Sequence, residues 1–125
     1  MGMDSALREK LDEAHQRRAN GDYENARHLY EDVLAAGLDS PESAEVRWGY
    51  GLVLQYTGAF DEALAELERA HREAPDNADY FLHLAMTRLM LGDFDRAVAE
   101  LTEIEEKFPD TAAADEATKQ LSYFR

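Results

Sequence analysis

The chain has 125 residues, 45% of them hydrophobic, which is enough for one folded domain with a continuous core. Its 13 basic and 27 acidic residues give a formal net charge of -14, and this charge repels nucleic-acid phosphates and anionic membrane surfaces. The absence of cysteine excludes disulfides and zinc-thiolate sites.

Helix-stop and helix-start residues divide the chain into short segments with apolar residues at helical spacing. Asp4 or Ser5 is predicted to cap the first helix, and Asp22 the second. Ser40 and Pro41 are predicted as the cap and first residue of the third helix. The seven predicted helices span residues 5–19, 23–36, 41–57, 60–73, 78–91, 94–107 and 111–124.

One stretch of the chain returns almost in register. Residues 58–75 (GAFDEALAELERAHREAP) match residues 92–109 (GDFDRAVAELTEIEEKFP) at a spacing of 34 residues. A looser copy begins at Gly21, 37 residues before Gly58. Such a period indicates a stacked supersecondary unit that buries its apolar face only against its neighbours.

This pattern resembles the tetratricopeptide repeat family. The matching positions are a small residue in each first helix, a glycine and an aromatic residue at each turn, an alanine early in each second helix, and a proline at two repeat ends. They are Ala14, Gly51, Ala85; Gly21/Tyr23, Gly58/Phe60, Gly92/Phe94; Ala26, Ala63, Ala97; and Pro75 and Pro109.

The resemblance implies an all-α, right-handed α-solenoid of three helical hairpins followed by a capping helix. We expect one domain over residues 1–125, with repeats at about 5–38, 41–76 and 78–110 and a capping helix at about 111–124. Small residues between the paired helices allow close approach. The turn aromatics should pack against the next repeat, and Leu67 should be buried.

In this family the first helix of each repeat lines a concave face. The resemblance therefore implies a peptide-binding groove at Leu11, His15, Trp48, Leu52, Tyr56, Leu82, Met86 and Met90, with Arg8, Arg18 and His83 at its rim. Aromatic anchors and adaptable methionines are typical of binding surfaces. Three occupancies remain open: a separate ligand, a second copy of the chain, or ordinary packing between repeats.

The family's carboxylate clamp for chaperone tails requires lysine, asparagine and arginine side chains. The aligned residues here are Leu11, His15, Gly49, Asp79 and His83, so this mode is not expected. The four histidines form no i, i+4 metal pair and no HExxH motif, and no cysteine is available as a nucleophile. We expect neither an enzyme nor a cofactor.

The first hypothesis is a non-catalytic protein interaction module that binds a short apolar or amphipathic peptide, as an adaptor, scaffold or chaperone. The alternative is a self-assembling structural module whose groove or terminal helix is filled by another copy. A cytoplasmic location is expected, because no run of roughly 18 apolar residues and no signal pattern is present. An envelope-associated location is the alternative if a signal has been removed.

Overall fold

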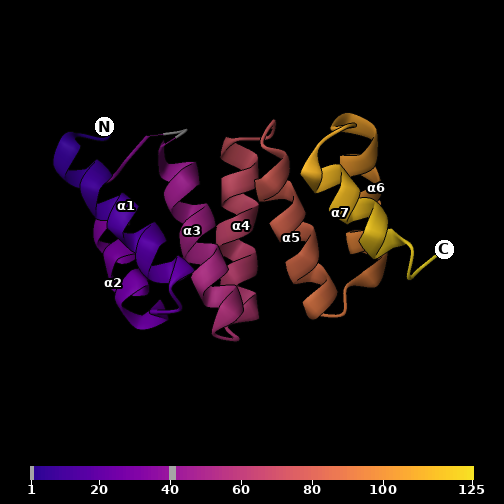
Figure 1. The fold of residues 1–125 in the computed structure, drawn as a ribbon, viewed down its shortest axis with the longest axis horizontal. Helices are drawn as coiled ribbons and strands as arrows, with labels where there is room; N and C mark the ends of the chain where they lie inside the picture. The colour runs from indigo at the N-terminus through magenta and orange to yellow at the C-terminus, as the bar shows by residue number, and fades with distance from the viewer. Residues whose placement is uncertain (1, 40–41) are drawn as a thin grey trace.

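The computed structural model describes residues 2–39 and 42–125, and these residues form seven α-helices and no strand (Figure 1). The largest difference from the predicted bounds is in the last helix, which ends at Leu121 rather than Phe124. The predicted roles of Ser40 and Pro41 fall outside the described residues. The helices are α1 (Ser5–Ala19), α2 (Tyr23–Leu34), α3 (Glu42–Tyr56), α4 (Phe60–Glu73), α5 (Ala78–Met90), α6 (Phe94–Lys107) and α7 (Ala112–Leu121).

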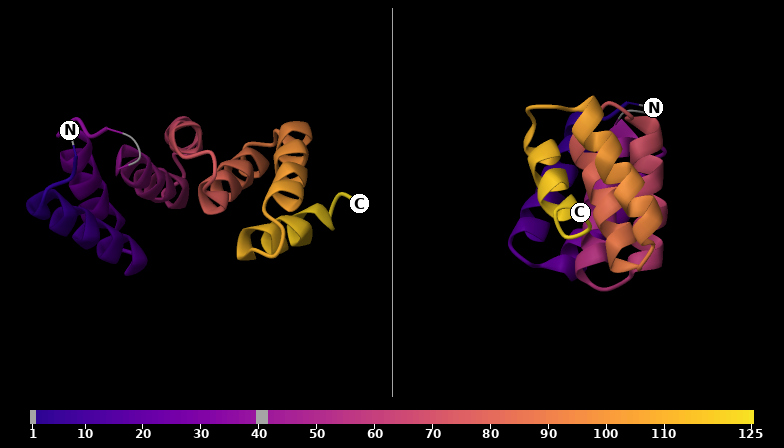
Figure 2. Two further views of the ribbon diagram at one scale, coloured as in Figure 1. Left: turned by 90° about the horizontal axis from the view of Figure 1, so that it is seen from above. Right: turned by 90° about the vertical axis from the view of Figure 1, so that its right-hand side faces the viewer.

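The helices stack as antiparallel hairpins in a single curved row. Helices α1 and α2, α3 and α4, and α5 and α6 pair with each other, and each hairpin also contacts the next. Helices α1, α3, α5 and α7 lie on one side and α2, α4 and α6 on the other (Figure 2, left). Because α1 and α7 both project toward the same side, the first helices line the concave face. The predicted all-α solenoid is confirmed.

Side-chain caps start three of the helices. Asp4, Asn77 and Thr111 accept hydrogen bonds from the backbone N–H three residues later, at 2.9, 3.0 and 3.1 Å. Asp22 occupies the N-cap position of α2 as predicted, but its side chain makes no capping hydrogen bond. Its carboxylate instead accepts hydrogen bonds from the side chains of Asn25 and Arg17.

A missing side chain allows α3 and α4 to approach each other. A Cβ atom at Gly51 would lie 2.8 Å from Cγ of Leu67, closer than real Cβ contacts come. Ala14 and Ala85, the matching small residues of the other first helices, are completely buried. The predicted use of small residues for close helix pairing is therefore confirmed.

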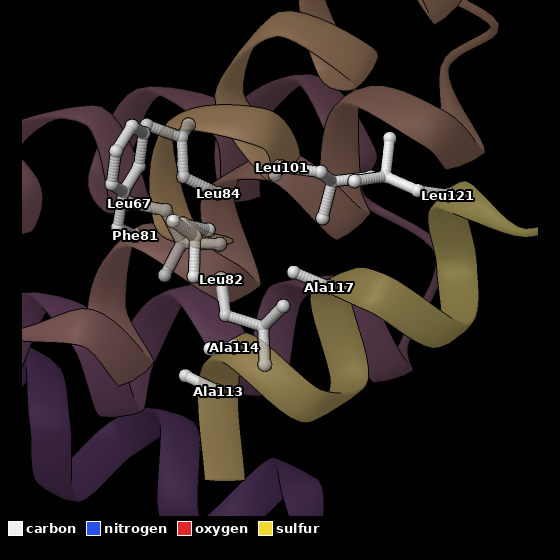
Figure 3. Close-up of a cluster of buried hydrophobic side chains, with 11 residues drawn as sticks. Leu67, Phe81, Leu82, Leu84, Leu101, Ala113, Ala114, Ala117 and Leu121 are labelled. Atoms are coloured by element: carbon white, nitrogen blue, oxygen red, sulfur yellow. The ribbon is translucent and has the colours of Figure 1, made fainter. Parts of the chain in front are cut away.

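Helix α7 covers the open end of the last hairpin. Ala113, Ala114 and Ala117 face Leu82 of α5, while Leu121 points toward Leu101 of α6 (Figure 3). These small side chains let α7 lie close to the hairpin, and they bury an apolar surface that would otherwise face water. Helix α7 thus closes the stack as a capping helix.

Tyr23 and Phe94, each of which follows a turn, pack against the next unit of the stack. Tyr23 stacks on Tyr56 with ring centroids 5.5 Å apart, and Phe94 meets Phe124 at 5.8 Å. This confirms the predicted packing between repeats for Tyr23 and Phe94. At the end of the stack, however, Phe94 and Phe124 remain 52% and 46% exposed.

We predict that Leu67→Ala lowers the free energy of unfolding by about 2–5 kcal/mol, because Leu67 is completely buried between α3 and α5 neighbours. Urea denaturation followed by circular dichroism measures this change. Leu91→Ala, at a residue 38% exposed, is the matched control and should cost less. Equal costs for the two variants would contradict the central position of Leu67.

Candidate functional site

The groove residues predicted from the sequence fall into two groups, one buried and one partly or fully exposed to solvent. Leu11, Leu52 and Leu82 are buried in the core, so they form the floor beneath the concave face and are not available for contacts. Tyr56 and Met90 are 57% and 48% exposed. His15, Trp48, Met86, Arg18 and His83 are half-buried, and Arg8 is exposed.

Trp48 on α3 is the centre of a set of side chains drawn from three first helices. Tyr80 of α5 stacks on its indole, with centroids 5.5 Å apart and an interplanar angle of 25°. His15 and His83 contact it at 5.9 and 6.0 Å, and the guanidinium carbon of Arg18 lies 5.0 Å from the ring centroid. We call these five residues, His15, Arg18, Trp48, Tyr80 and His83, the Trp48 cluster.

A buried tyrosine from α2 supports the cluster from below. Tyr30 is completely buried, and its hydroxyl lies 2.6 Å from Nδ1 of His15 and 3.0 Å from Nε of Arg18. Its ring occupies the place where a side chain at Gly49 would project, because a Cβ atom there would lie 2.6 Å from the ring. Tyr30 reaches the concave face because residue 49 is glycine.

Glu45 joins the same network at the edge of the cluster. Arg8 binds both of its carboxylate oxygens, at 2.9 and 2.7 Å, and Nε2 of His15 lies 2.9 Å away. The hydrogen bonds from His15 and Arg8 lower the pKa of Glu45 to about 2. Since an ionised carboxylate only accepts, Nε2 of His15 carries a proton and the hydroxyl of Tyr30 is free to donate to Nδ1.

His83 is held as a neutral acceptor. The indole Nε1 of Trp48 donates to its Nδ1 at 3.0 Å, and indole can only donate. Burial is the main cause that lowers the pKa of His83. His83 therefore fixes the orientation of the Trp48 ring by a hydrogen bond that requires the uncharged imidazole.

Sequence reasoning missed three members of this arrangement, Tyr30, Glu45 and Tyr80. Tyr80 aligns with Val46, a completely buried residue, so the repeat pattern favoured a core position. A tyrosine ring is longer than valine and reaches the concave face instead. The glycine at position 49 was the available signal for Tyr30, because glycine within a helix often marks a close approach by another group.

Two cavities lie away from the Trp48 cluster. One of about 390 Å³ is lined by residues of α2 and α3, and one of about 460 Å³ by residues of α4, α5 and α6. In the larger cavity Arg88 is 4% exposed and lies 2.7 Å from Glu100 and 3.6 Å from Glu68. This buried ion pairing joins the three helices and is consistent with a structural role for the wall of the cavity.

Residues 2–39 and 42–125 contain no cluster of three metal-ligating side chains from His, Cys, Asp and Glu. None of the helices within these ranges is long and apolar enough to cross a membrane. The arrangement on the concave face consists of aromatic stacking, a cation over an indole, and thioethers. Groups of this kind are suited to contacts and hydrogen bonds with a ligand.

Comparison with known families identifies the class of protein. Two sequence profiles described as tetratricopeptide repeat match residues 11–78 and 54–121, each more than half of the chain. The chain therefore belongs to the tetratricopeptide repeat family. No curated protein sequence matches it.

Several solved structures share the fold. PcrH from Pseudomonas aeruginosa is 20% identical, with a TM-score of 0.85, and the match covers 98% of this chain and 94% of PcrH. The Yersinia enterocolitica type III secretion chaperone SycD, solved with a peptide of the translocator YopD, is 17% identical with a TM-score of 0.80 over 97% of this chain and 90% of SycD. The TPR2B domain of yeast Sti1, in complex with pHsp70, is 20% identical with a TM-score of 0.83 over 96% and 95%.

We predict that Gly49→Ala destabilises the fold by about 1–3 kcal/mol, although alanine is the better helix former. The added methyl would overlap the ring of Tyr30, which is completely buried. Urea denaturation measures the cost. In a Tyr30→Leu background the same substitution should be neutral or stabilising, and an equal cost in both backgrounds would contradict the proposed contact.

We predict that stability falls as the pH drops below about 6.5. Burial lowers the pKa of His83, and of His71, below the ordinary value of 6.5, so the unfolded chain binds protons in this range while the folded chain does not. The ionised Glu45 also contributes to the free energy of unfolding, and this contribution is lost only at lower pH, from 4.5 down to about 2, because its pKa is lowered in the fold.

Urea denaturation at about pH 7 and about pH 5 tests this pH dependence. His83→Gln keeps an acceptor for the Trp48 indole but does not titrate, so its stability should fall less between the two pH values. Equal losses in the wild type and in His83→Gln would show that His83 does not cause the effect.

Proposed function

We propose that this chain is a non-catalytic interaction module that binds a short apolar or amphipathic segment of another protein at the Trp48 cluster. The single observation that carries this proposal is the half-buried Trp48 stacked on Tyr80 on the concave face, where three first helices meet. A tryptophan held in this way has a fixed orientation and an accessible surface. Rigid aromatic side chains of this kind are the commonest binding hot spots.

The surroundings of the indole favour an apolar ligand. The indole packs against the core cluster that contains Leu82, which excludes water from that side of the ring. Tyr56 and Met90 are exposed at the end of α3 and α5, and Met86 is half-buried between Trp48 and that end. Methionine adapts its shape to different partners, so these residues would extend the apolar contact beyond the indole.

Proteins of the same fold give independent support for a peptide ligand. SycD has been solved with a peptide of YopD, and the TPR2B domain of Sti1 with pHsp70. The low identities mean that the fold is shared and that the ligands are not transferred. Here Leu11 is buried and Gly49 lies under Tyr30, so two positions of the family's carboxylate clamp offer no polar group.

A second candidate function is self-assembly through the end of the stack. Apolar side chains are exposed where α5, α6 and α7 meet the solvent, and Phe94 contacts Phe124 without being covered. A second copy could bury this surface. The exposed residues are Met90, Leu91, Phe94, Tyr123 and Phe124.

Selection from a displayed library of peptides of roughly nine residues tests the first candidate, since an extended peptide of that length would span about 30 Å of the concave face. We predict that the wild type enriches peptides with aromatic or aliphatic anchors, and that Trp48→Ala weakens binding of the enriched peptides at least about tenfold. Fluorescence titration of a labelled peptide measures the affinity.

His28→Ala on α2 is the control, because His28 is exposed on the other layer of helices and should leave the affinity unchanged. Light scattering over a concentration series measures the oligomeric state and so tests the second candidate, self-assembly. A wild type that enriches no Trp48-dependent peptide, but dimerises until Phe94 and Phe124 are replaced by serine, would favour self-assembly over peptide binding.

A further inference from the structure

We propose that the segment bound at the Trp48 cluster carries an aspartate or glutamate side chain next to its apolar anchor, and that Arg18 binds this carboxylate. The inference rests on the proposed function and specifies the chemistry of the partner at the same site. The observation behind it is that Arg18 lies over the Trp48 ring with its terminal nitrogens unpaired among the described residues.

Arg18 is a half-buried cation with unused donors. Its guanidinium lies 5.0 Å from the centroid of the Trp48 ring, and its Nε donates to the hydroxyl of Tyr30 at 3.0 Å. These contacts leave the two terminal nitrogens, Nη1 and Nη2, without a hydrogen-bond partner in the described part of the chain. No carboxylate there forms an ion pair with Arg18.

The other arginines at comparable depth are neutralised within the fold. Arg47 is half-buried and lies 2.8 Å from Glu66, and Arg88 is buried and lies 2.7 Å from Glu100. Arg18 is half-buried and lacks such a partner, so a carboxylate that reached its terminal nitrogens would form an ion pair strengthened by partial burial. Among the half-buried and buried arginines of the described ranges, Arg18 alone is in this position.

The carboxylate within the same network is already committed. Glu45 accepts hydrogen bonds from both terminal nitrogens of Arg8 and lies within hydrogen-bonding distance of Nε2 of His15. Glu45 therefore forms no ion pair with Arg18. The hydroxyl of Tyr30 accepts a hydrogen bond from the Nε of Arg18 only. A carboxylate that binds the terminal nitrogens of Arg18 would therefore come from the ligand.

The position of Arg18 beside Trp48 determines what the ligand should look like. Arginine can bind a carboxylate through two parallel hydrogen bonds, and partial burial strengthens them relative to an exposed pair. The neighbouring Trp48 and Tyr80 rings take an apolar side chain. One segment that satisfies both groups has an acidic residue adjacent to an aromatic or aliphatic residue.

This requirement opposes the overall charge of the chain. A net charge of -14 favours basic partners at long range. If long-range attraction governed binding, selected peptides would be rich in lysine and arginine. The cation at Arg18 predicts acidic residues instead. Long-range attraction and the local ion pair therefore predict opposite charges in the selected peptides.

We expect the carboxylate to be a side chain rather than a free C-terminus. His15 lies on the same helix as Arg18 and also contacts Trp48, so a segment that crosses the cluster passes the guanidinium and continues over α1. A library displayed as an internal loop has no free C-terminus. It therefore presents only side-chain carboxylates.

The experiment is selection of such a loop library on the wild type, Arg18→Gln and Arg69→Gln. Arg69 on α4 is exposed and its replacement changes the net charge equally, which makes it the matched control. We expect an acidic residue beside the apolar anchor in peptides selected on the wild type and on Arg69→Gln. This preference should be lost on Arg18→Gln.

Synthetic copies of the enriched peptides, with amidated C-termini, then give the coupling between the two charges. Trp48 is the single tryptophan of the chain, so its fluorescence reports occupancy of the site. Replacing the peptide Glu by Gln should weaken binding to the wild type about tenfold and have little effect on Arg18→Gln. Arg18→Lys, which keeps a charge but not the planar fork, should retain part of the effect.

Each other outcome overturns the inference. Enrichment of basic residues, an equal Glu-to-Gln effect in the wild type and Arg18→Gln, or binding only with a free C-terminus would each contradict it. If the Arg18 variants do not fold, the selection on the wild type and the effect of the Glu-to-Gln change on wild-type binding still decide whether the ligand needs a carboxylate, and an absent effect refutes the inference. Trp48-dependent binding without acidic preference would refute this inference alone, whereas no Trp48-dependent peptide would refute the proposed function as well.

Discussion

The contact between Tyr30 and Gly49 is the constraint on which the candidate site depends. A fully buried tyrosine from α2 passes over a position with no side chain on α3 and brings its hydroxyl to His15 and Arg18. Any larger residue at position 49 would push the ring back, because the interior is close-packed. The orientation of both polar side chains then follows from a close approach of two helices.

This network explains how a strongly acidic chain has no unpaired negative charge among the side chains that contact Trp48. Glu45 is neutralised by Arg8, and His83 is held uncharged by its hydrogen bond from Trp48. What remains at the centre is an indole and one guanidinium. Because charges elsewhere are solvated and screened over roughly 8 Å in physiological salt, they contribute to solubility and association rate more than to specificity at the site.

The fold provides the platform and the side chains on it define the function. SycD and the TPR2B domain of Sti1 share this fold and have been solved with different ligands, and at identities near 20% they establish the architecture alone. Among the positions that carry the carboxylate clamp in this family, Leu11 is buried, Gly49 has no side chain, and His15 and His83 are engaged in the Trp48 cluster. A peptide-binding role for this chain therefore rests on its own concave face.

The sequence by itself determined the architecture. A spacing of 34 residues between matching glycines, aromatics and prolines specifies stacked hairpins, since each of these residues acts through local backbone conformation or helix pairing. It also indicated which helices line the concave face, and named Trp48, Met86 and Arg18 among their residues. It did not separate Leu11, Leu52 and Leu82 from Trp48, because repeat alignment assigns equivalent positions the same depth whatever the size of the side chain.

Only the tertiary structure decided which side chains meet. Tyr30, Glu45 and Tyr80 come from three helices and join His15, Arg18 and Trp48 through the packing of neighbouring repeats. Periodicity describes what repeats, whereas these contacts link residues that do not recur from one repeat to the next. Their distances follow from the relative placement of whole helices, which depends on side-chain volumes across the entire core.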